Sequence, residues 1–586
     1  MCLSPASRID VLLTAAFLSL DLPVALARAV PATRPDLGDF QCNGALAAAA
    51  LVGRTGRAIA EDIAAYLRQE PAFAEVSVAG PGFINLRLSA AFIAQGLDAV
   101  AADDRLGIPD EGRARRVVLD FGGPNVAKPL HVGHLRSLVL GESLRRIHAA
   151  LGWSTHADAH LGDWGLQMGM LSAAIRRTDP TLAFFDSEAV VPFPETAPVT
   201  LRELERLYPE AAAACREDPG RMAEARADTA ALQAADPGLT ALWRSLRALS
   251  LSSQAADFER LGVRFDALDG ESDVRDAIAP LVARLRACGV ATASEGAVVI
   301  EVAEPTDSSP VPPLLLAKSD GAALYATTDL ATLEARASVP GLARVVYVVD
   351  QRQALHFEQV FRAARKAGIA HDVELVHAGF GTVNGPDGKP FKTRSGGVAR
   401  LADLLDDAVA RAAERLSSSG YGMDLDGAQR EALTRQVGVA AVKFADLSGD
   451  RLSGYVFDPA RMVAFEGRTG PYLQYACVRL RSLLARAAGE VVGPAQASAP
   501  VERDLALHCL SFGDTVSEAA RLYQPGVLAA YAYTLAQHFS RFYGECPVRS
   551  EPDPAVRAAR LALCALTERV LTRCLDLLGI DVPLRM

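Results

Sequence analysis

The sequence predicts an α/β protein of three domains: an N-terminal α+β domain, a central parallel-sheet domain and a C-terminal all-α helix bundle. Apolar runs of strand length alternate with helical segments through the middle of the chain. Beyond residue 401, long helical patterns are separated by Gly and Pro turns. The 586 residues, half of them apolar, are enough for several cores. We place the domains at residues 1–113, 114–401 and 402–586.

The first predicted domain begins with an apolar segment, Val11–Leu20, that superficially resembles a secretory signal. Arg8 and Asp10 precede it, so the positive bias of a signal is missing, and Asp21 interrupts the apolar run. We therefore expect an amphipathic surface helix. An alanine-rich helix comes next, and Val76–Leu88 alternates like a strand. Together these elements indicate a small α+β domain.

Composition narrows the class of protein. The net charge of −10 does not by itself indicate a nucleic-acid partner, although it does not exclude a local basic surface. Nine cysteines occur without a C-x-x-C pair or regular spacing, which disfavours zinc sites and disulfides and favours a reducing compartment. No uninterrupted apolar stretch reaches the roughly 20 residues of a membrane span. We expect a cytoplasmic protein without membrane association.

Five apolar runs are the strand candidates of the central domain. Helical segments separate them, which predicts a parallel sheet with crossover helices and ligands at the carboxyl ends of the strands. Residues 178–253 are rich in Ala, Glu, Arg and Leu at helical spacing and carry no catalytic-looking cluster, so we expect a helical insertion with a structural role. The strand candidates are Val117–Phe121, Val298–Val302, Ala322–Ala326, Val345–Val349 and Val373–Ala378.

A glycine turn and a motif with two histidines follow the first of these strands. Pro129 and the amphipathic run after it signal a helix, which puts His131 and His134 one turn apart in its first turn. Free backbone amides and the positive helix end favour phosphate there, and Gly133 lets a flat adenine approach. Two imidazoles and Lys128 can stabilise charge on a triphosphate without a covalent nucleophile. The histidines alone could equally cap or pack, but the strand, turn and helix context favours a nucleotide site.

Residues 124–137 have the pattern P-N-x-A-K-x-x-H-x-G-H-L-R-S, which resembles the HIGH signature of class I aminoacyl-tRNA synthetases in the form found in arginyl-tRNA synthetases. The similarity runs essentially end to end. Further motifs in the family's order and approximate spacing are Asp163-Trp164-Gly165, Gly270-Glu271-Ser272, Tyr325–Asp329, Gln353–Phe357, Phe391–Gly396 and Ala464–Gly467. The resemblance implies a Rossmann-like catalytic domain, an N-terminal domain that contacts the outer corner of tRNA, and an anticodon-binding helical domain.

The same resemblance implies an arginine site. A guanidinium is planar and always charged, so carboxylates that accept its forked hydrogen bonds suit it, as does an aromatic face. Glu271, Asp329 and Tyr325 supply these groups, although each alone could be a turn residue, a helix cap or a core residue. The residues that match the arginine site of the family are Asn125, Glu271, Tyr325, Asp329 and Gln353.

The glycine-rich basic loop 384–397 suits closure over a triphosphate, although such a loop is often only a surface hairpin. It aligns with the KMSKS loop of the family, with Phe391 at the first lysine position and Arg394 at the second. The resemblance implies that Lys128 takes over the displaced charge at the α-phosphate. The implied catalytic residues are His131, His134, Lys128, Lys392 and Arg394, the ATP-binding residues are Gly133, His131, His134, Thr393 and Ser395, and no metal ligands are expected.

Aromatic and arginine side chains of the C-terminal domain are candidates for tRNA contact, because unpaired bases stack on such groups. Phe539, Phe542 and Tyr543 recur at helical spacing, so at least two of them are expected in the core. The candidates for tRNA contact are Tyr475, Arg479, Arg541 and Tyr543.

The family resemblance implies ATP-dependent attachment of L-arginine to tRNA(Arg) through an arginyl-adenylate, with Mg²⁺ accompanying ATP. It also implies initial attack by the 2′-hydroxyl and adenylate formation that needs bound tRNA, and we expect a monomer. A nucleotidyltransferase that acts without tRNA is disfavoured by the long helical C-terminal region. A non-catalytic synthetase-like protein is disfavoured by the intact His131, His134 and Lys128. Ala159 stands where the family commonly has asparagine, which keeps a diverged or specialised paralogue as an alternative.

Overall fold

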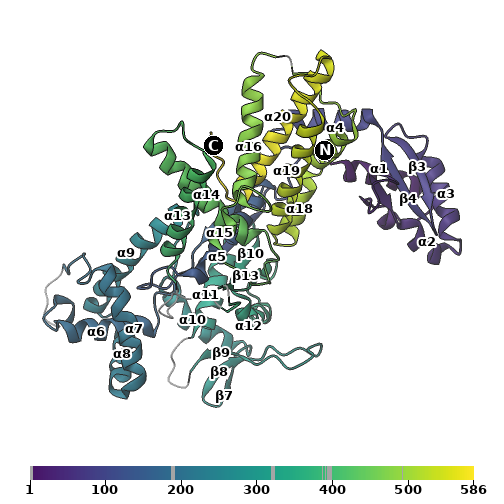
Figure 1. Cartoon of the computed structure of the whole chain (residues 1–586). Coiled ribbons are helices and arrows are strands. Elements are labelled where there is room, and N and C mark those ends of the chain that lie inside the picture. The colour runs from purple at the N-terminus through teal and green to yellow at the C-terminus, as the bar shows by residue number, and fades with distance from the viewer. Residues whose placement is uncertain are drawn as a thin grey trace.

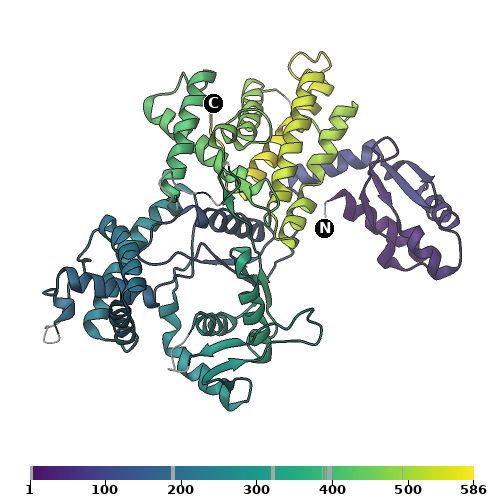
Figure 2. The ribbon, with the colours of Figure 1, turned by 60° about the horizontal axis from the view of Figure 1, so that its bottom comes forward.

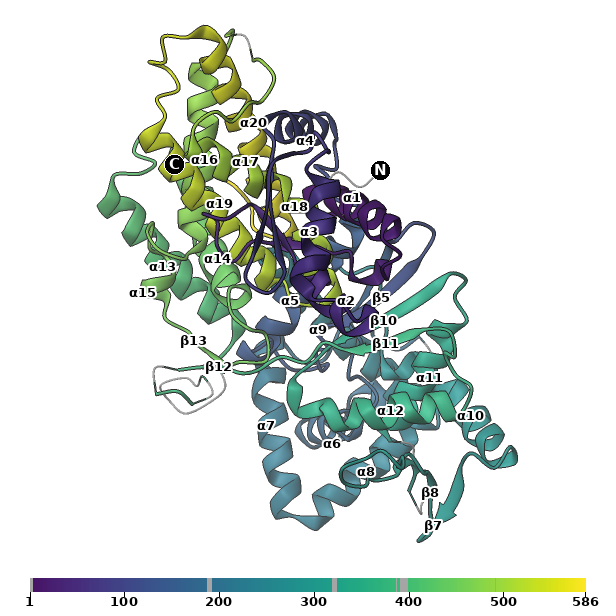
Figure 3. The ribbon, with the colours of Figure 1, turned by 90° about the vertical axis from the view of Figure 1, so that its right-hand side faces the viewer.

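The computed structural model describes residues 4–186, 192–318, 324–385, 387–389, 391, 399–490 and 492–586. An N-terminal lobe (purple) stands at one side of the molecule and the helices α6 to α8 at the other, with the C-terminal helices above the central sheet (Figure 1, Figure 2). Figure 3 views the molecule from the side of the N-terminal lobe. Within these described ranges, no helix combines the length and the apolar character that crossing a bilayer requires.

The N-terminal lobe is a four-stranded antiparallel sheet, in the order β1-β2-β4-β3, covered by helices. The predicted single strand 76–88 is wrong, because β3 and β4 form a hairpin there that turns through Gly80 (φ 54°). The predicted surface helix is confirmed as part of α1, with Leu13 and Phe17 buried and Val11 exposed. The bounds are α1 Pro5–Ser19, η1 Val24–Leu26, β1 Ala29–Pro31, β2 Phe40–Cys42, α2 Gly44–Val52, α3 Gly56–Leu67, β3 Phe73–Ala79, β4 Phe83–Leu88 and α4 Ala90–Ala102.

A parallel sheet of four strands, in the order β11-β10-β5-β6, forms the centre of the molecule. Three of the predicted strands are confirmed as β5, β10 and β11. Strand β6 was not predicted, because it is an edge strand whose residues other than Ala157 are polar. The bounds are β5 Arg116–Phe121, β6 Ser154–Asp158, β10 Leu342–Val348 and β11 Glu374–His377.

Two predicted members of the parallel sheet are wrong. The run Val298–Val302 contains β8, which belongs to a separate antiparallel sheet of order β7-β8-β9. Tyr325 and Ala326 begin helix α11, while residues 319–323 lie outside the described ranges. An apolar run alone distinguishes neither a parallel from an antiparallel strand nor a strand from a helix. The bounds are β7 Thr292–Ser294, β8 Ala297–Ile300 and β9 Leu314–Ala317.

Helices cover the parallel sheet and form a bundle beside it (Figure 1). The bounds around the sheet are α5 Val132–Ala150, α6 Leu166–Thr178, η2 Ala183–Phe185, α7 Leu201–Glu217, α8 Pro219–Gln233, α9 Pro237–Arg260, η3 Glu271–Val274, α10 Arg275–Ala287, α11 Tyr325–Ala337, η4 Gln351–Gln353 and α12 Ala354–Lys366. Those of the C-terminal region are β12 Val383–Asn384, α13 Leu401–Ser419, α14 Gly427–Leu447, β13 Tyr455–Val456, α15 Pro459–Met462, α16 Gly470–Arg486, α17 Pro500–Leu510, α18 Phe512–Arg521, α19 Gly526–Glu545 and α20 Pro554–Leu577. The predicted C-terminal helix bundle is confirmed.

Helix α5 connects the sheet to the bundle. Its buried residues Leu138 and Leu144 belong to one core that also contains residues of α14 and α20. The helix approaches β5 at Gly141, where an added Cβ would lie 2.2 Å from Cγ of Phe121. The absence of a side chain at this position therefore sets the distance between α5 and the sheet.

We expect Gly141→Ala to lower the free energy of unfolding by about 1–3 kcal/mol, because the added methyl group overlaps the Phe121 ring and must displace it. Urea unfolding followed by circular dichroism measures the change. Gly427→Ala, at the first residue of α14, is the control, since a Cβ added there would meet no atom within 4 Å. Equal stabilities of the two variants would contradict the close packing of α5 on β5.

Candidate active site

The turn after β5 brings helix α5 to the carboxyl end of the parallel sheet. Gly122 (φ 87°) and Ala127 (φ 69°) have left-handed backbone, which folds the intervening residues back over the strand ends. The Ser137 hydroxyl accepts a hydrogen bond from the Gly122 amide at 2.7 Å and donates one to the Val348 carbonyl at 2.6 Å. The first turns of α5 are therefore fixed to the ends of both β5 and β10.

His131 and His134 lie against each other, with ring centroids 3.9 Å apart. Helix α5 begins at Val132, so the predicted start at Pro129 is wrong, and His131 is the N-cap residue. Its Nδ1 accepts from the Gly133 amide at 3.0 Å, while Nδ1 of His134 accepts from the His131 amide at 3.0 Å. The imidazoles therefore occupy two amides that were expected to be free for phosphate.

Both imidazoles are neutral donors in this arrangement. Because each Nδ1 accepts a hydrogen bond, the proton of each ring is assigned to Nε2. Burial lowers the pKa of His134 to about 3, with the nearby His131 adding to the effect. Burial and the positive charge of Lys128 also lower the pKa of His131. Two neutral N–H groups can thus donate to phosphate oxygens without adding charge of their own.

A cavity of about 230 Å³ lies next to His131. Gly133 of α5 borders it on one side, and Phe380, Val383 and Phe391 provide apolar walls. Such a mixture of apolar walls and exposed helix backbone suits a flat heteroaromatic base. The loop residues predicted to serve catalysis and ATP binding, Lys392, Thr393, Arg394 and Ser395, lie outside the described ranges.

The predicted arginine-binding residues lie around the start of α11. Tyr325 and Asp329 are one turn apart in that helix, and the Tyr325 hydroxyl lies near Gly165, since a Cβ added there would be 3.5 Å away. Burial raises the pKa of Glu271 to about 7, with contributions from Asp163 and Asp329 opposing the Trp164 amide that lowers it. Glu271 also contributes, after partial burial, to the raised pKa of Tyr325, a residue that is 65% exposed.

The other two predicted residues, Asn125 and Gln353, come from two different segments. Asn125 forms a β-bridge with Gly162, and its Oδ1 lies so near that a Cβ on Gly162 would be 2.4 Å from it. Gln353 is exposed in η4, immediately before α12. Helix α12 also carries His356, whose Nε2 lies 2.6 Å from Oδ2 of Asp329. His356 belongs to one of the sequence motifs but was not predicted to have a role of its own.

Asp163 holds the segment that carries Glu271. Its fully buried carboxylate accepts hydrogen bonds from the Ser272 amide at 3.0 Å and hydroxyl at 2.8 Å, and from Nε of Arg247 at 3.0 Å. The Trp243 indole donates to the Asp163 carbonyl at 2.8 Å. Arg247 and Trp243 belong to α9, so this helix supports the pocket from outside the sheet.

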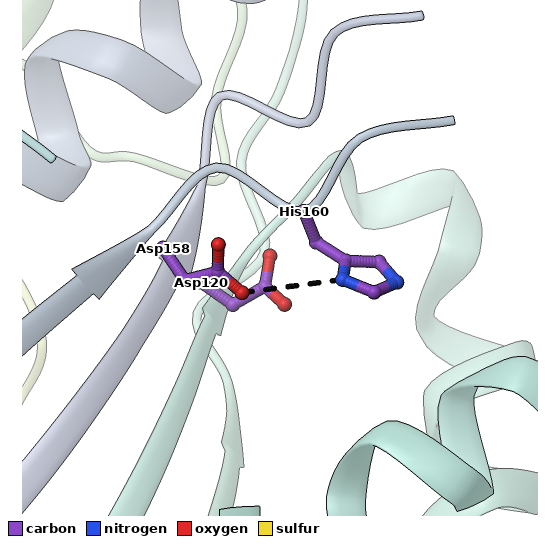
Figure 4. Close-up of side chains that lie close together, drawn as sticks. All are labelled: Asp120, Asp158 and His160. Carbon is purple, nitrogen blue, oxygen red and sulfur yellow. Dashed lines mark ion pairs between the residues drawn. The ribbon is translucent and has the colours of Figure 1, made fainter. Parts of the chain in front are cut away.

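Asp120, Asp158 and His160 converge at the ends of β5 and β6 (Figure 4). Their ligand atoms lie within 4.8 Å of one another, a spacing that metal ions also require. Here Nη1 of Arg336 lies 2.8 Å from Asp120 and Nη2 lies 2.6 Å from Asp158. The guanidinium already supplies the positive charge between the two carboxylates, and His160 Nδ1 lies farther off, 3.9 Å from Asp158.

The groups of this buried cluster shift one another's pKa values. Burial raises the pKa of Asp158, as does the neighbouring Asp120, against the effect of Arg336. For Arg336 itself, burial lowers the pKa but the attraction of both carboxylates raises it above the ordinary value. Arg336 was not predicted from the sequence, although it follows Asp329 by seven residues and so shares a face of α11 with it.

The four candidates for tRNA contact do not form one surface. The Arg479 guanidinium lies 4.0 Å from the Tyr543 ring, and Tyr475 precedes Arg479 by one turn of α16. Arg541 pairs instead with Glu545 and Asp504. Arg541 faces a different side of α19 from Tyr543, because the two residues are two positions apart and such residues do not share a helix face. Phe539 and Phe542 are buried, as predicted.

Comparison with known proteins agrees with this geometry. The family models that match are tRNA synthetases class I (R), catalytic domain, over residues 97–459, the DALR anticodon binding domain over 473–586, and the Arginyl tRNA synthetase N terminal domain over 9–88. Fold, site and catalytic-domain match define a class I aminoacyl-tRNA synthetase. Within that class, the chain belongs to the arginyl-tRNA synthetase family.

Relatives match over the whole chain. The arginine–tRNA ligase of Maricaulis maris is 46% identical over 586 residues, covering 100% of both chains, and that of Hyphomonas neptunium is 44% identical over 98% of each. The crystal structure of Plasmodium falciparum arginyl-tRNA synthetase superposes with a TM-score of 0.84 at 26% identity, covering 100% of this chain and 99% of that one. Thermus thermophilus arginyl-tRNA synthetase gives 0.80 at 25% identity, covering 99% and 100%.

We expect Arg336→Met to lower the free energy of unfolding by about 3–5 kcal/mol, because two buried carboxylates would lose their counter-charge. Urea unfolding measures the change. Arg206→Met, which removes an exposed pair with Glu210 on α7, is the control and should cost less than about 1 kcal/mol. Similar losses for both variants would show that the Arg336 cluster does not hold the strand ends together.

Proposed function

We propose that this protein attaches L-arginine to tRNA(Arg) with ATP, through an arginyl-adenylate. The observation that carries the proposal is the pairing of two pockets of opposite character at the carboxyl end of one parallel sheet. His131, His134 and Lys128 present donors and a cation, whereas Glu271 and Asp329 present carboxylates. A nucleoside triphosphate suits the first pocket and a cationic amino acid suits the second.

The reaction has two steps. A carboxylate oxygen of arginine attacks the α-phosphorus of ATP, forming the mixed anhydride and releasing pyrophosphate. The 2′-hydroxyl of the terminal ribose then attacks the arginyl carbonyl, and AMP leaves. The neutral Nε2–H groups of His131 and His134 donate to phosphate oxygens, and Lys128 neutralises the charge that builds on them. Proximity and charge stabilisation carry the chemistry, so no protein acid or base is needed.

The loop beyond Phe391 completes the nucleotide site in this proposal. Lys392 and Arg394 supply cations, Thr393 and Ser395 bind ATP, and Mg²⁺ enters with ATP as part of the substrate. Phe391 lies against Phe457, with ring centroids 5.6 Å apart, so the loop begins from a fixed point beside the cavity.

Asp329 and Glu271 accept hydrogen bonds from the charged groups of arginine, Tyr325 offers its ring, and Asn125 and Gln353 complete the pocket. His356 holds the Asp329 carboxylate in place at 2.6 Å, which leaves its other oxygen for the substrate. A fixed carboxylate suits the forked donors of a guanidinium better than it suits the single ammonium of lysine.

Each of the three domains has its own role in the proposed function. Residues 1–113 contact the outer corner of the tRNA, residues 114–401 catalyse, and residues 402–586 contact the stem and anticodon, with Tyr475, Arg479, Arg541 and Tyr543 at the tRNA. The matched N-terminal and DALR families support this division. We also propose that the protein is a monomer, and the substrates of translation suit a cytoplasmic location.

A specialised paralogue is the alternative, and Ala159 is the observation behind it. This residue is fully buried, and its amide donates to the Ala267 carbonyl at 3.3 Å. An asparagine amide would add a polar group at a position that here is apolar. Asp158 nevertheless accepts a hydrogen bond from the Asp269 amide, and Glu271 accepts one from the Trp164 amide.

We expect ATP/pyrophosphate exchange that depends on arginine and on added tRNA. Lysine, citrulline and canavanine serve as comparison substrates, and His131→Asn should lower the exchange rate on the order of 10²-fold by misplacing the phosphate donors. Charging of total tRNA with labelled arginine is the second readout. Absence of exchange with every amino acid would overturn the proposal and favour the paralogue.

Arginine affinity should depend on pH through Glu271, whose pKa of about 7 leaves it mostly protonated at pH 6 and mostly ionised at pH 8. Because the cationic ligand needs the carboxylate, the dissociation constant for arginine should rise by roughly tenfold per pH unit below 7 and level off above it. Isothermal titration calorimetry from pH 5.5 to 8.5 measures this.

Glu271→Gln is the matched variant for this titration. It should bind arginine more weakly than the parent at pH 8 and show a flat profile, because its amide does not ionise. A flat profile in the parent, or the same slope in both proteins, would assign the pH dependence to another group.

A further inference from the structure

Helix α7, in the segment predicted to have only a structural role, faces the active site. The Tyr208 ring lies 4.4 Å from Nζ of Lys128, and Oε1 of Glu205 lies 3.8 Å from Nη2 of Arg400. Tyr208 and Glu205 are three residues apart and therefore share a face of the helix. Two side chains of α7 thus reach two different segments of the nucleotide site.

Packing fixes α7 in this position. Leu204 and Leu207 are buried in a core that also contains Trp164 and Trp243. Trp164 follows Asp163, the residue that holds the Glu271 segment. The helix is therefore anchored to the supports of the arginine pocket, and Tyr208 is presented from a rigid base.

The backbone of Lys128 is equally well held. The amide of Ala127, which has left-handed backbone, donates to the Ser250 hydroxyl at 2.9 Å. Nε2 of Gln254 donates to the Lys128 carbonyl at 3.3 Å. The four-carbon side chain of Lys128 is left to be oriented, and among the residues that the structure describes Tyr208 contacts its ammonium.

An aromatic partner has a specific advantage for this lysine. Within the described ranges, no carboxylate lies within ion-pairing distance of Lys128. A carboxylate would hold the ammonium but would also repel phosphate and neutralise the charge that phosphate needs. The face of an aromatic ring attracts a cation while carrying no net charge. The ammonium is thus positioned with its full charge available to an anion.

Tyr208 also approaches the arginine pocket. After burial and Glu271, the nearby Tyr208 hydroxyl is a cause of the raised pKa of Tyr325. On the other side, Arg400 pairs by backbone with His131, and the Leu401 amide donates to the Leu130 carbonyl at 2.9 Å. Helix α7 therefore lies where the two pockets and the returning end of the loop meet.

We propose that Tyr208 is a positioning residue for the reaction: its ring holds the Lys128 ammonium where the α-phosphate of ATP binds. The inference rests on the proposed function, since it assigns a partner to Lys128 in the adenylation step. Tyr208 contacts neither substrate in this proposal and acts through Lys128 alone.

The test compares Tyr208→Leu with Tyr208→Phe in arginine-dependent ATP/pyrophosphate exchange with tRNA present. Loss of the ring should lower kcat by roughly 3- to 30-fold with the KM for arginine unchanged, whereas the phenylalanine variant keeps the ring and should lose less than about threefold. Phe185→Leu is the control, because it removes a different cation–π contact, 4.9 Å from Arg176, away from Lys128. It should exchange like the parent.

A double-mutant cycle separates positioning from general support of the fold. In a Lys128→Ala background, Tyr208→Leu should have no further effect on kcat. An undiminished effect in that background, or equal losses in Tyr208→Leu and Phe185→Leu, would overturn the inference. Equal losses in Tyr208→Leu and Tyr208→Phe would also overturn it, by assigning the role to the hydroxyl.

Absence of exchange in the parent would contradict the proposed function but would not test the contact between Tyr208 and Lys128. A spectroscopic measurement tests that contact separately. In protein whose lysines carry ¹³C-methyl groups, the Lys128 resonance is assigned by its absence in Lys128→Arg. The ring current of Tyr208 should shift this resonance upfield in the parent and in Tyr208→Phe, and the shift should vanish in Tyr208→Leu. An unshifted resonance in the parent would overturn the contact itself.

Discussion

The buried guanidinium of Arg336 is the interaction on which the placement of Asp329 and Glu271 depends. It joins α11 to Asp120 at the end of β5 and to Asp158 at the end of β6, and it lies 5.6 Å from the ring of Tyr347 in β10. Asp158 also accepts a hydrogen bond from the Asp269 amide at 3.1 Å, just before Glu271. Buried charges are tolerated only when they are paired, so this arrangement fixes one orientation of α11 relative to the sheet. The two segments that carry Asp329 and Glu271 are thereby held by a single cation.

Burial shifts the pKa values of His134 and Glu271 in opposite directions, and in both groups it favours the neutral form. It lowers the pKa of His134 to about 3, so the imidazole stays neutral, and it raises the pKa of Glu271 to about 7, so the carboxyl group is readily protonated. In the proposed function, a cationic substrate would restore the charge of Glu271 when it binds, whereas ATP would meet donors that need not change their protonation state.

Local patterns predicted the parts of this site that follow from one segment of chain. The run 117–121 and the motif around His131 predicted the strand and the turn beside the cavity. The N-cap position of His131 was not predictable, because it depends on the hydrogen bond that the His131 imidazole accepts from the Gly133 amide, which competes with an earlier helix start. Strand β6 lacked an apolar signal, and β8 could not be assigned to its own small sheet from its composition. Arg336 and Tyr208 became visible only in three dimensions, because each acts on residues far away in sequence.

The cavity beside His131 is bounded by the start of α5 and by residues between Asp350 and Phe391, and α5 also contacts the C-terminal bundle. Arg136, which follows the histidines in α5, lies 3.0 Å from Asp446 of α14 and donates to the Ser453 carbonyl at 2.8 Å. Both partners of this ion pair are almost completely buried. Separation of α14 from α5 would leave two unpaired charges in an apolar core, at a cost of several kcal/mol. The start of the C-terminal bundle is therefore tied to α5, the helix at whose start His131 and His134 lie.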